Sequence, residues 1–167
     1  PENREKLAAD VAKKLGVATR AVAVPQQAAV GADLVYVATN SGGRVVLRHG
    51  QLGSARFVAS IGSTLPEQRE LDAGVLVAAD HLILDTWDGL DESGDALAAA
   101  AVGLDRSRAM LLGNMPAGLR GRPGLTVYKS IGSPEQDLVL AHAILEDAAE
   151  RGYGQPMEPL SAVKKNL

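Results

Sequence analysis

Asp33-Leu34-Val35-Tyr36-Val37-Ala38-Thr39 decides the fold, because a nearly continuous apolar run of this kind is typical of a parallel strand covered on both faces. Three further short runs, at residues 56–61, 81–85 and 125–130, predict strands of the same type. A shorter strand is expected at residues 19–24. Helical patterns lie between these strands. The sequence therefore predicts an α/β fold, a parallel sheet with helices on both of its faces.

The helices are predicted from apolar spacing and from capping residues. The first covers about residues 4–15, a second follows Asp72, and an Ala-rich helix covers about residues 92–102. The segment 103–124, which lies between the Ala-rich helix and the last strand, is expected to be irregular or weakly helical.

The final helix has the clearest start and stop signals. Ser133 is expected to cap it, Pro134 occupies its first position, and Gln136 completes a capping box. Gly152 is expected to end it. Four residues at helical spacing predict its buried stripe: Leu138, Ala141, Leu145 and Ala148.

Composition excludes several classes of function. Hydrophobic residues make up 46% of the chain and charged residues 22%, so a real core is expected. The formal net charge is −3, aromatics are only 3%, and no stretch concentrates Lys or Arg, which argues against nucleic-acid binding. The absence of cysteine excludes disulfides and thiolate chemistry. No apolar run is long enough to span a bilayer, so a cytoplasmic protein with no membrane partner is expected.

Three loops that follow strands share a small, polar, glycine-containing character: residues 39–42, 62–64 and 130–133. We call them the three corners. The carboxyl ends of parallel strands meet at one edge of a sheet, and ligands of open α/β sheets bind there. Small residues let a flat ligand approach the backbone closely, although they are equally ordinary turn residues. A G-x-G-x-x-G fingerprint, which would identify a dinucleotide site by itself, is absent.

Two longer motifs add to this pattern. Residues 60–72 resemble the "(A/S)-(V/I)-G-x-x-x-P-x-x-x-E-L-D" signature of the ornithine cyclodeaminase/mu-crystallin family, and residues 128–138 resemble its "(F/Y)-K-S-(V/I)-G-x-x-x-x-D" signature. Residues 32–39 and 92–95 fit further landmarks of the family in the same order. The resemblance runs from about residue 1 to residue 154.

The resemblance implies an incomplete Rossmann-like NAD(P)-binding domain over residues 1–132 and a C-terminal helix and tail, residues 133–167, that belong to a substrate and dimerisation domain. Members of the family are about twice as long, so the first strand and the glycine-rich pyrophosphate loop are expected to lie upstream of this chain. The implied cofactor is NAD or NADP. The implied partners are a small amino-acid, keto-acid or imine substrate and a second copy of the protein.

The resemblance also implies roles for individual residues. Ile131 and Gly132 are expected at the substrate pocket, and Gln68 stands where ornithine cyclodeaminase has a lysine that contacts the cofactor. The full set of expected cofactor contacts is Thr39, Ile61, Gly62, Ser63, Thr64, Gln68 and Ser130.

Thr64 is the departure that shapes the functional prediction. It stands where ornithine cyclodeaminases carry a catalytic Asp, and an isolated hydroxyl cannot act as a base near neutral pH. Reduction of an already protonated imine needs no base there, so Thr64 favours an imine or ketimine reductase or an amino-acid dehydrogenase. Ornithine cyclodeaminase itself, a non-catalytic binding protein and an inactive truncated fragment remain alternatives. Thr64 as a simple loop residue also remains open.

Other conspicuous residues are assigned structural roles. His49, His81 and His142 share no metal-ligand spacing, and no metal is expected. An acidic run is interpreted as a solvated helix cap rather than a metal site: Asp85, Asp88, Asp91, Glu92 and Asp95. No nucleophile motif of the G-x-S-x-G type occurs, which argues against a hydrolase.

Overall fold

The structure of the chain is a computed structural model that describes residues 2–118, 123–155 and 157. Contacts within the chain divide it into two compact units, Pro1–Gly132 and Ser133–Leu167. Each unit is described by itself below.

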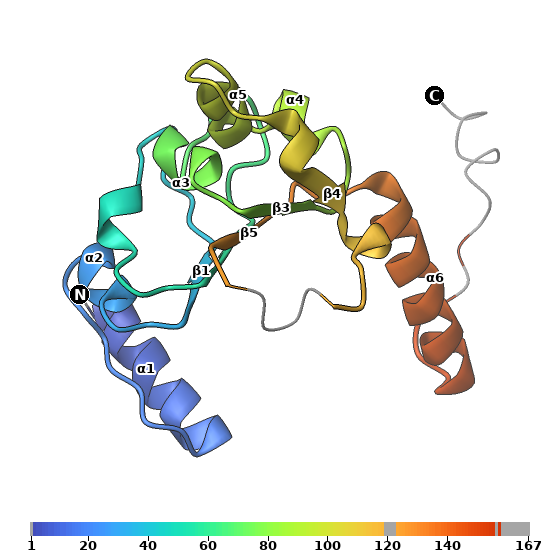
Figure 1. The fold of residues 1–167 in the computed structure, drawn as a ribbon. Coiled ribbons are helices and arrows are strands. Elements are labelled where there is room, and N and C mark those ends of the chain that lie inside the picture. The colour runs from blue at the N-terminus through green and yellow to red at the C-terminus, as the bar shows by residue number, and fades with distance from the viewer. Residues whose placement is uncertain (1, 119–122, 156, 158–167) are drawn as a thin grey trace. The chain divides into compact units, whose positions relative to one another are not determined.

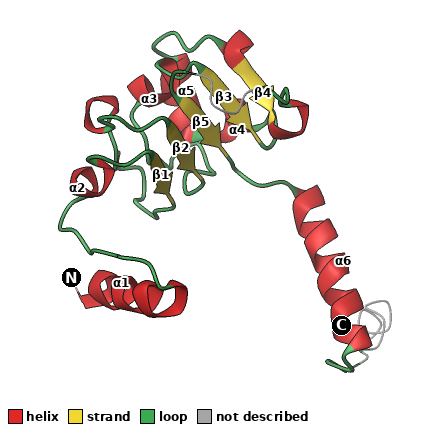
Figure 2. Ribbon diagram, turned by 60° about the horizontal axis from the view of Figure 1, so that its bottom comes forward, coloured by secondary structure: helices red, strands yellow, loops and turns green. Residues whose placement is uncertain are grey.

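The first unit is built on one five-stranded parallel sheet. Its strands are β1 (Leu34–Val37), β2 (Phe57–Ser60), β3 (His81–Leu84), β4 (Ala109–Leu111) and β5 (Thr126–Lys129). Their spatial order is β1-β2-β5-β3-β4, so the last strand in the sequence lies in the middle of the sheet (Figure 2). The predicted α/β class and parallel sheet are confirmed.

The helices of the first unit are mostly short. They are α1 (Glu2–Leu15), α2 (Pro25–Ala29), α3 (Ala73–Val77), α4 (Gly89–Glu92) and α5 (Gly94–Ala100), with 3-10 turns at His49–Gln51, Arg106–Arg108 and Leu112–Asn114. Asp72 caps α3 as predicted, because its carboxylate accepts from the backbone N–H of Val75. Helices α3, α4 and α5 lie on the same side of the sheet (Figure 1).

The hydrophobic core lies under these helices. Val58, Val127, Leu82 and Leu84 point from the central strands into one buried cluster, to which α2, α3, α4 and α5 all contribute apolar residues. Residues 58, 127 and 82 are direct neighbours in the parallel register, so their side chains leave the sheet on the same face. Leucine, valine and alanine fill this cluster, as the low aromatic content implied.

The opposite face of the sheet differs from the prediction of a second helical layer. Leu34 and Tyr36 of β1 are 57% and 61% exposed. The apolar run of β1 is therefore covered on one face only within the described residues. Further along the same face, Phe57, Ile83 and Tyr128 line an apolar pocket of about 300 Å³ together with Leu112 and Met115.

Two other predictions about elements were wrong, and one helix was not predicted. Residues 19–24 form no strand and lead as a loop into α2. The Ala-rich helix predicted at about residues 92–102 is confirmed as α5, and α4, which the extended backbone of Ser93 separates from it, was not predicted. The segment expected to be irregular contains β4, a three-residue edge strand that pairs with β3 alone.

The second unit consists mainly of α6 (Pro134–Glu150). Ser133 caps it as predicted, because its side chain accepts from the backbone N–H of Gln136. The predicted buried stripe was wrong: no residue of α6 is buried, and Leu138 and Leu145 are 70% and 68% exposed. The described part of this unit offers α6 no sheet or second helix on which to pack. The tail beyond residue 157 lies outside the described residues.

Among the helices that the structure describes, none combines the length and the apolar character that crossing a membrane requires.

Candidate functional site

The three corners meet at one edge of the sheet. They follow β1, β2 and β5, which are parallel and adjacent, so the carboxyl ends of all three strands point the same way (Figure 2). Backbone hydrogen bonds continue past the strand ends: the N–H of Ile61 donates to the carbonyl of Val37 at 3.0 Å, and the N–H of Ser130 donates to that of Ser60 at 3.0 Å. The structure therefore brings the predicted corners together.

Glu70 joins the first two corners from below, and the sequence analysis gave this residue no role. Its side chain is fully buried. One carboxylate oxygen, Oε1, accepts from both the N–H and the hydroxyl of Thr39. The other, Oε2, accepts from the N–H of Gly62 at 2.7 Å and from the hydroxyl of Ser60 at 2.9 Å. The carboxylate thus receives four hydrogen bonds from residues at the ends of β1 and β2.

Thr64 lies in the second corner and is paired with Gln68. The side-chain oxygen of Gln68 accepts from the Thr64 N–H at 2.9 Å and from the Thr64 hydroxyl at 3.2 Å. Among the described residues, this hydroxyl bonds to no carboxylate or imidazole. An amide oxygen cannot take up a proton near neutral pH, so neither residue supplies a general base.

Ser63 turns away from the edge. It is fully buried, and its hydroxyl donates to the backbone carbonyl of Gln68 at 2.8 Å. Of the expected cofactor contacts, Ser63 can therefore offer a ligand only its backbone. Ile61, Gly62 and Thr64 are half-buried.

Asp85 holds the third corner. It follows β3, the neighbour of β5, and its carboxylate accepts from the Ser130 hydroxyl at 2.7 Å, from the Gly132 N–H at 2.7 Å and from the Ile131 N–H at 3.2 Å. The N–H groups that could have received an anionic ligand at this corner are therefore occupied by the protein's own carboxylate. The interpretation of Asp85 as a solvated cap was wrong, because its partners lie in a loop 45 or more residues away.

Asp95 and Lys129 form a buried pair beside Glu70. Both side chains are fully buried, and Lys129 Nζ lies 3.8 Å from Asp95 Oδ2 and 3.2 Å from the Ser60 hydroxyl. Burial lowers the pKa of Lys129, and the nearby carboxylates of Asp95, Glu70 and Asp85 offset part of that effect. The Asp95 Oδ1 atom accepts from the N–H groups of Glu70 and Leu71.

The solvated-cap interpretation was therefore wrong for Asp95 as well, whereas Asp88, Asp91 and Glu92 are exposed. Asp95 also accepts from Arg69 Nε at 3.2 Å. The residues that the sequence analysis missed are thus Glu70, Asp85, Asp95 and Lys129. Glu70, Asp95 and Lys129 stand inside the quoted family motifs or landmarks, but nothing in their spacing indicates that they meet below the corners.

Two glycines explain how closely these parts pack. A Cβ atom on Gly62 would lie 2.2 Å from the carbonyl oxygen of Thr39 and 2.3 Å from Glu70 Oε1. A Cβ atom on Gly94 would lie 2.1 Å from the carbonyl oxygen of Gln68. Both positions need glycine because the neighbouring chain occupies the space of a side chain.

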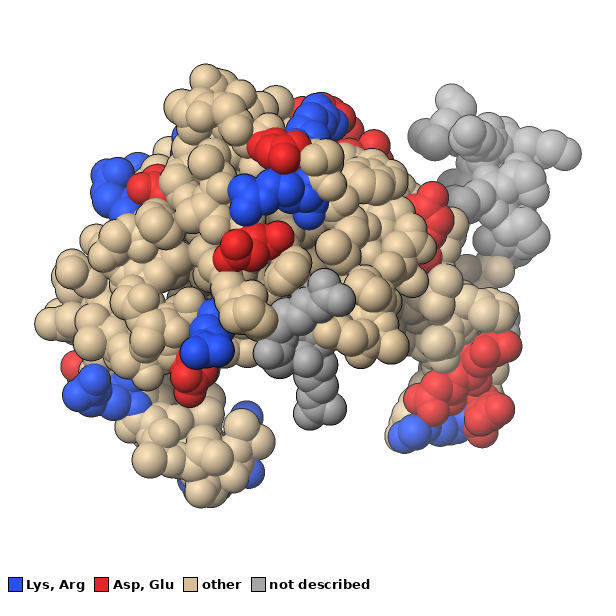
Figure 3. All heavy atoms as spheres, viewed as in Figure 1, with Lys and Arg blue, Asp and Glu red and all other residues tan. Residues whose placement is uncertain are grey.

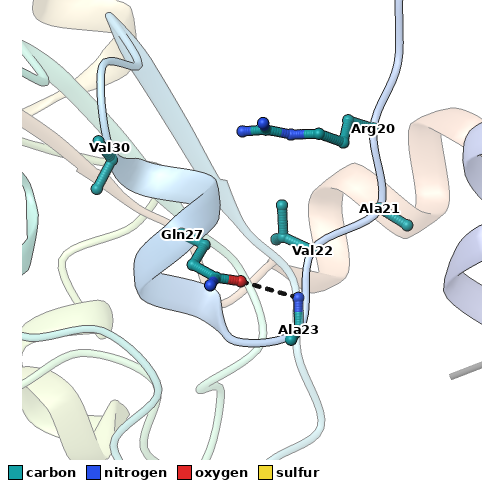
Figure 4. Close-up of a pocket in the computed structure, with 6 residues that line it drawn as sticks. All are labelled: Arg20, Ala21, Val22, Ala23, Gln27 and Val30. Carbon is teal, nitrogen blue, oxygen red and sulfur yellow. Dashed lines mark hydrogen bonds between the residues drawn. The ribbon is translucent and has the colours of Figure 1, made fainter.

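Pockets in the first unit lie at and away from this edge. An apolar pocket of about 130 Å³ between α2 and β1 reaches Thr39. A larger one, of about 450 Å³, lies between the loop at residues 20–23 and α2, where Arg20 extends over it and Gln27 accepts from the N–H of Ala23 (Figure 4). This larger pocket contains none of the predicted site residues.

The charged side chains of the described residues form no metal site. Within that part of the chain, no group of three or more His, Asp or Glu side chains could hold a metal ion. On the face seen in Figure 3, Lys and Arg lie in small groups beside Asp and Glu, without one basic patch.

A parallel sheet with glycine-containing corners at its carboxyl edge defines the chain as a Rossmann-like α/β protein. More narrowly, the chain belongs to the ornithine cyclodeaminase/mu-crystallin family, whose sequence profile matches residues 1–152. The predicted family is confirmed.

Similar proteins include several imine reductases. The Δ1-pyrroline-2-carboxylate reductase of Bacillus thuringiensis subsp. konkukian is 28% identical over 134 residues, which cover 76% of this chain and 41% of that protein. The iminosuccinate reductase of Paracoccus denitrificans is 29% identical over 95% of this chain and 49% of that protein. The chain therefore spans less than half the length of these relatives.

Solved structures of similar proteins superpose on most of this chain. The Thermococcus litoralis Δ1-pyrroline-2-carboxylate reductase in complex with NADH and L-proline superposes with a TM-score of 0.82 at 29% identity, covering 94% of this chain and 50% of that one. A probable ornithine cyclodeaminase from Bordetella pertussis superposes with a TM-score of 0.72 at 33% identity, covering 90% of this chain and 50% of that one.

Proposed function

We propose that the full-length protein is an NAD(P)H-dependent oxidoreductase that reduces a small imine or ketimine, or interconverts an amino acid and its imino acid. The observation that carries this proposal is the environment of Thr64, whose hydroxyl bonds to an amide oxygen and, within the part of the chain that the structure describes, to no base. The similarity to reductases of Δ1-pyrroline-2-carboxylate and of iminosuccinate supports it.

The three corners fit a nicotinamide ring. Most of their residues are small, which lets a flat ligand approach the backbone, and the apolar pocket at Thr39 adjoins the same edge. We propose that Ile61, Gly62, Thr64 and Ser130 contact the ring and that Ile131 and Gly132 border the substrate. The bound cofactor would supply the hydride.

The protein's own residues would position the reactants. Asp85 fixes the backbone of the third corner, so Ile131 presents its side chain from a rigid loop. Gln68 holds the Thr64 hydroxyl, which would act as a small polar contact and leave the proton on the imine nitrogen. Ser63 would contribute backbone only, because its hydroxyl is used internally.

The proposal is tested with the full-length gene product and a panel of cyclic and linear imines. Oxidation of NADH or NADPH is followed at the nicotinamide absorbance, and both cofactors are compared because nothing in residues 1–167 selects between them. Substrate-dependent oxidation supports the proposal. Cofactor binding without turnover of any imine would instead favour a non-catalytic binding protein.

Ornithine cyclodeaminase is the second candidate, and the similarity to the Bordetella protein favours it. Thr64→Asp places a carboxylate where ornithine cyclodeaminases carry their catalytic Asp. The Thr64 side chain that it replaces is half-buried beside Gln68. If the missing base is what blocks deamination, this variant should release ammonia and proline from ornithine at a higher rate than the wild type. A wild type that already releases proline from ornithine would reject the reductase assignment.

The first unit would be part of the NAD(P)-binding domain, and α6 with the following tail would belong to a domain that makes a homodimer. The protein would act in the cytoplasm. Light scattering of the full-length protein tests the dimer, and a monomer at micromolar concentration would contradict it.

A further inference from the structure

Glu70 is the group around which the first two corners are built. Each of its two oxygens receives one backbone N–H: Oε1 that of Thr39, and Oε2 that of Gly62. Each oxygen also receives one hydroxyl, from Thr39 and from Ser60 respectively. A single carboxylate therefore fixes the distance between the end of β1 and the end of β2.

Because the Thr39 and Gly62 N–H groups donate to different oxygens of Glu70, both oxygens must be acceptors. A hydroxyl can rotate to donate or to accept, but a backbone N–H can only donate in a direction set by the chain. An amide in place of the carboxylate would offer one acceptor and one NH₂ group, so one of the two backbone N–H groups would face another donor. Only a carboxylate satisfies both corners at once.

The surroundings hold the Glu70 side chain in one position. Ser60 accepts from Lys129 Nζ and donates to Glu70, so the hydroxyl links the buried ammonium to the carboxylate. Above Glu70, the backbone of Gly62 packs so closely that a Cβ would lie 2.3 Å from Oε1. The second corner cannot move toward the Glu70 carboxylate, because there is no space. It can move away only by breaking the charge-assisted hydrogen bond from the Gly62 N–H to Glu70.

We infer that Glu70 is a positioning residue for hydride transfer, which sets where the Thr39 and Gly62 corners hold the nicotinamide relative to the substrate. This inference rests on the proposed function and deepens it. Glu70 is fully buried, so a ligand at the corners would meet the backbone that it holds and not its carboxylate. Misplacement of a reacting atom by about 1 Å can cost about 100-fold in rate, which is the scale expected when one corner is released.

The central variant is Glu70→Gln, which keeps the shape of the side chain and removes one acceptor. The matched control is Glu67→Gln in the same loop, where the side chain is exposed. Thr39→Val provides a milder variant that removes only the hydroxyl hydrogen bond to Glu70. All are made in the full-length protein, with NADH or NADPH and the imine that the wild type reduces.

Two measurements separate positioning from general damage. The first is the kinetic isotope effect with cofactor deuterated at the transferred hydrogen, together with kcat and KM. A smaller folded fraction lowers kcat but leaves the isotope effect unchanged. The second needs no turnover: amide proton shifts of Thr39 and Gly62 report whether each N–H still donates to a carboxylate.

In Glu70→Gln we expect kcat to fall by about 10- to 100-fold, with a larger isotope effect, little change in KM for the imine, and a shift of one of the two amide protons. Glu67→Gln should match the wild type. If Glu70→Gln folds and its isotope effect equals that of the wild type, the inference is wrong. If Glu70→Gln does not fold, an isotope effect in Thr39→Val equal to that of the wild type overturns the inference instead. A wild type with no imine reduction but with both amide shifts at their carboxylate-bonded positions rejects the proposed function and leaves the geometry intact.

Discussion

Gly62 shows how much a single residue can decide at the sheet edge. Its backbone N–H donates to Glu70, and its Cα hydrogens face the carbonyl oxygen of Thr39. The space for a side chain is taken by main chain and by a buried carboxylate, neither of which can give way cheaply. Glycine is required here by packing.

Gly62→Ala is therefore expected to push the second corner off Glu70. We expect the free energy of unfolding to fall by about 1–3 kcal/mol, the usual cost of overpacking, and the affinity for NAD(P)H to fall with it. Urea denaturation and cofactor fluorescence measure the two effects. Gly50→Ala is the control, since a Cβ there meets nothing within 4 Å; equal losses in both variants would contradict the packing argument.

For individual residues, the sequence predicted the three corners but not the carboxylates beneath them. Glycines and hydroxyls after apolar runs predicted all three corners, because strand ends and turn residues are local features. The acceptors beneath them are not local. Glu70 pairs with Thr39 from 31 residues away, and Asp85 pairs with Gly132 from 47 residues away. Such pairs depend on strand order, which one sequence does not reveal.

At the level of elements, α5 is tied to the chain at residues 69–71 by Asp95. One oxygen of this carboxylate accepts from two backbone N–H groups and from Arg69, while the other faces Lys129 of β5 without a hydrogen bond. Gly94, at the start of α5, lets the helix approach the carbonyl of Gln68. The helix, the second corner and the central strand are thus joined at one buried point.

Asp95→Asn should destabilise this junction, because it removes the carboxylate that interacts most strongly with the Lys129 ammonium. We expect the free energy of unfolding to fall by about 3 kcal/mol, which is the lower end of the cost of breaking a buried ion pair. The lower end applies because Lys129 Nζ and Asp95 Oδ2 are 3.8 Å apart and share no hydrogen bond. Lys129→Met should then cost less in the Asp95→Asn background than in the wild type. Denaturant unfolding of the four proteins measures the coupling, and strictly additive losses would show that the pair contributes nothing.

The elements that the sequence analysis missed share a physical cause. β4 is three residues long and pairs on one side only, so it carries too little apolar sequence to stand out. The stripe of α6 had the right spacing for burial, but spacing reports which face is apolar and says nothing about what covers it. The helices with strong local caps, at Asp72 and Ser133, began where predicted.

For the molecule as a whole, the buried charges should be visible in how stability depends on pH. Burial lowers the pKa of Lys129 below its ordinary value of 10.5, so the unfolded chain holds this proton more tightly than the folded one. The free energy of unfolding should therefore rise with pH as the pH passes through the folded-state pKa, and this contribution stops growing above 10.5. Urea titrations of wild type and Lys129→Met, from about pH 7 upward, isolate it. If the free energies of unfolding of wild type and Lys129→Met differ by the same amount at every pH, Lys129 is not the source of the pH dependence.

The position of β5 also has a consequence for biosynthesis. This strand lies between β2 and β3, yet it leaves the ribosome after both of them. Until residue 129 has emerged, β2 and β3 each present an open edge of unpaired amides, the kind of surface that recruits foreign strands. The nascent chain must keep those two edges apart and then admit a strand between them. Its sheet is completed from the centre, by the last of the five strands to be synthesised.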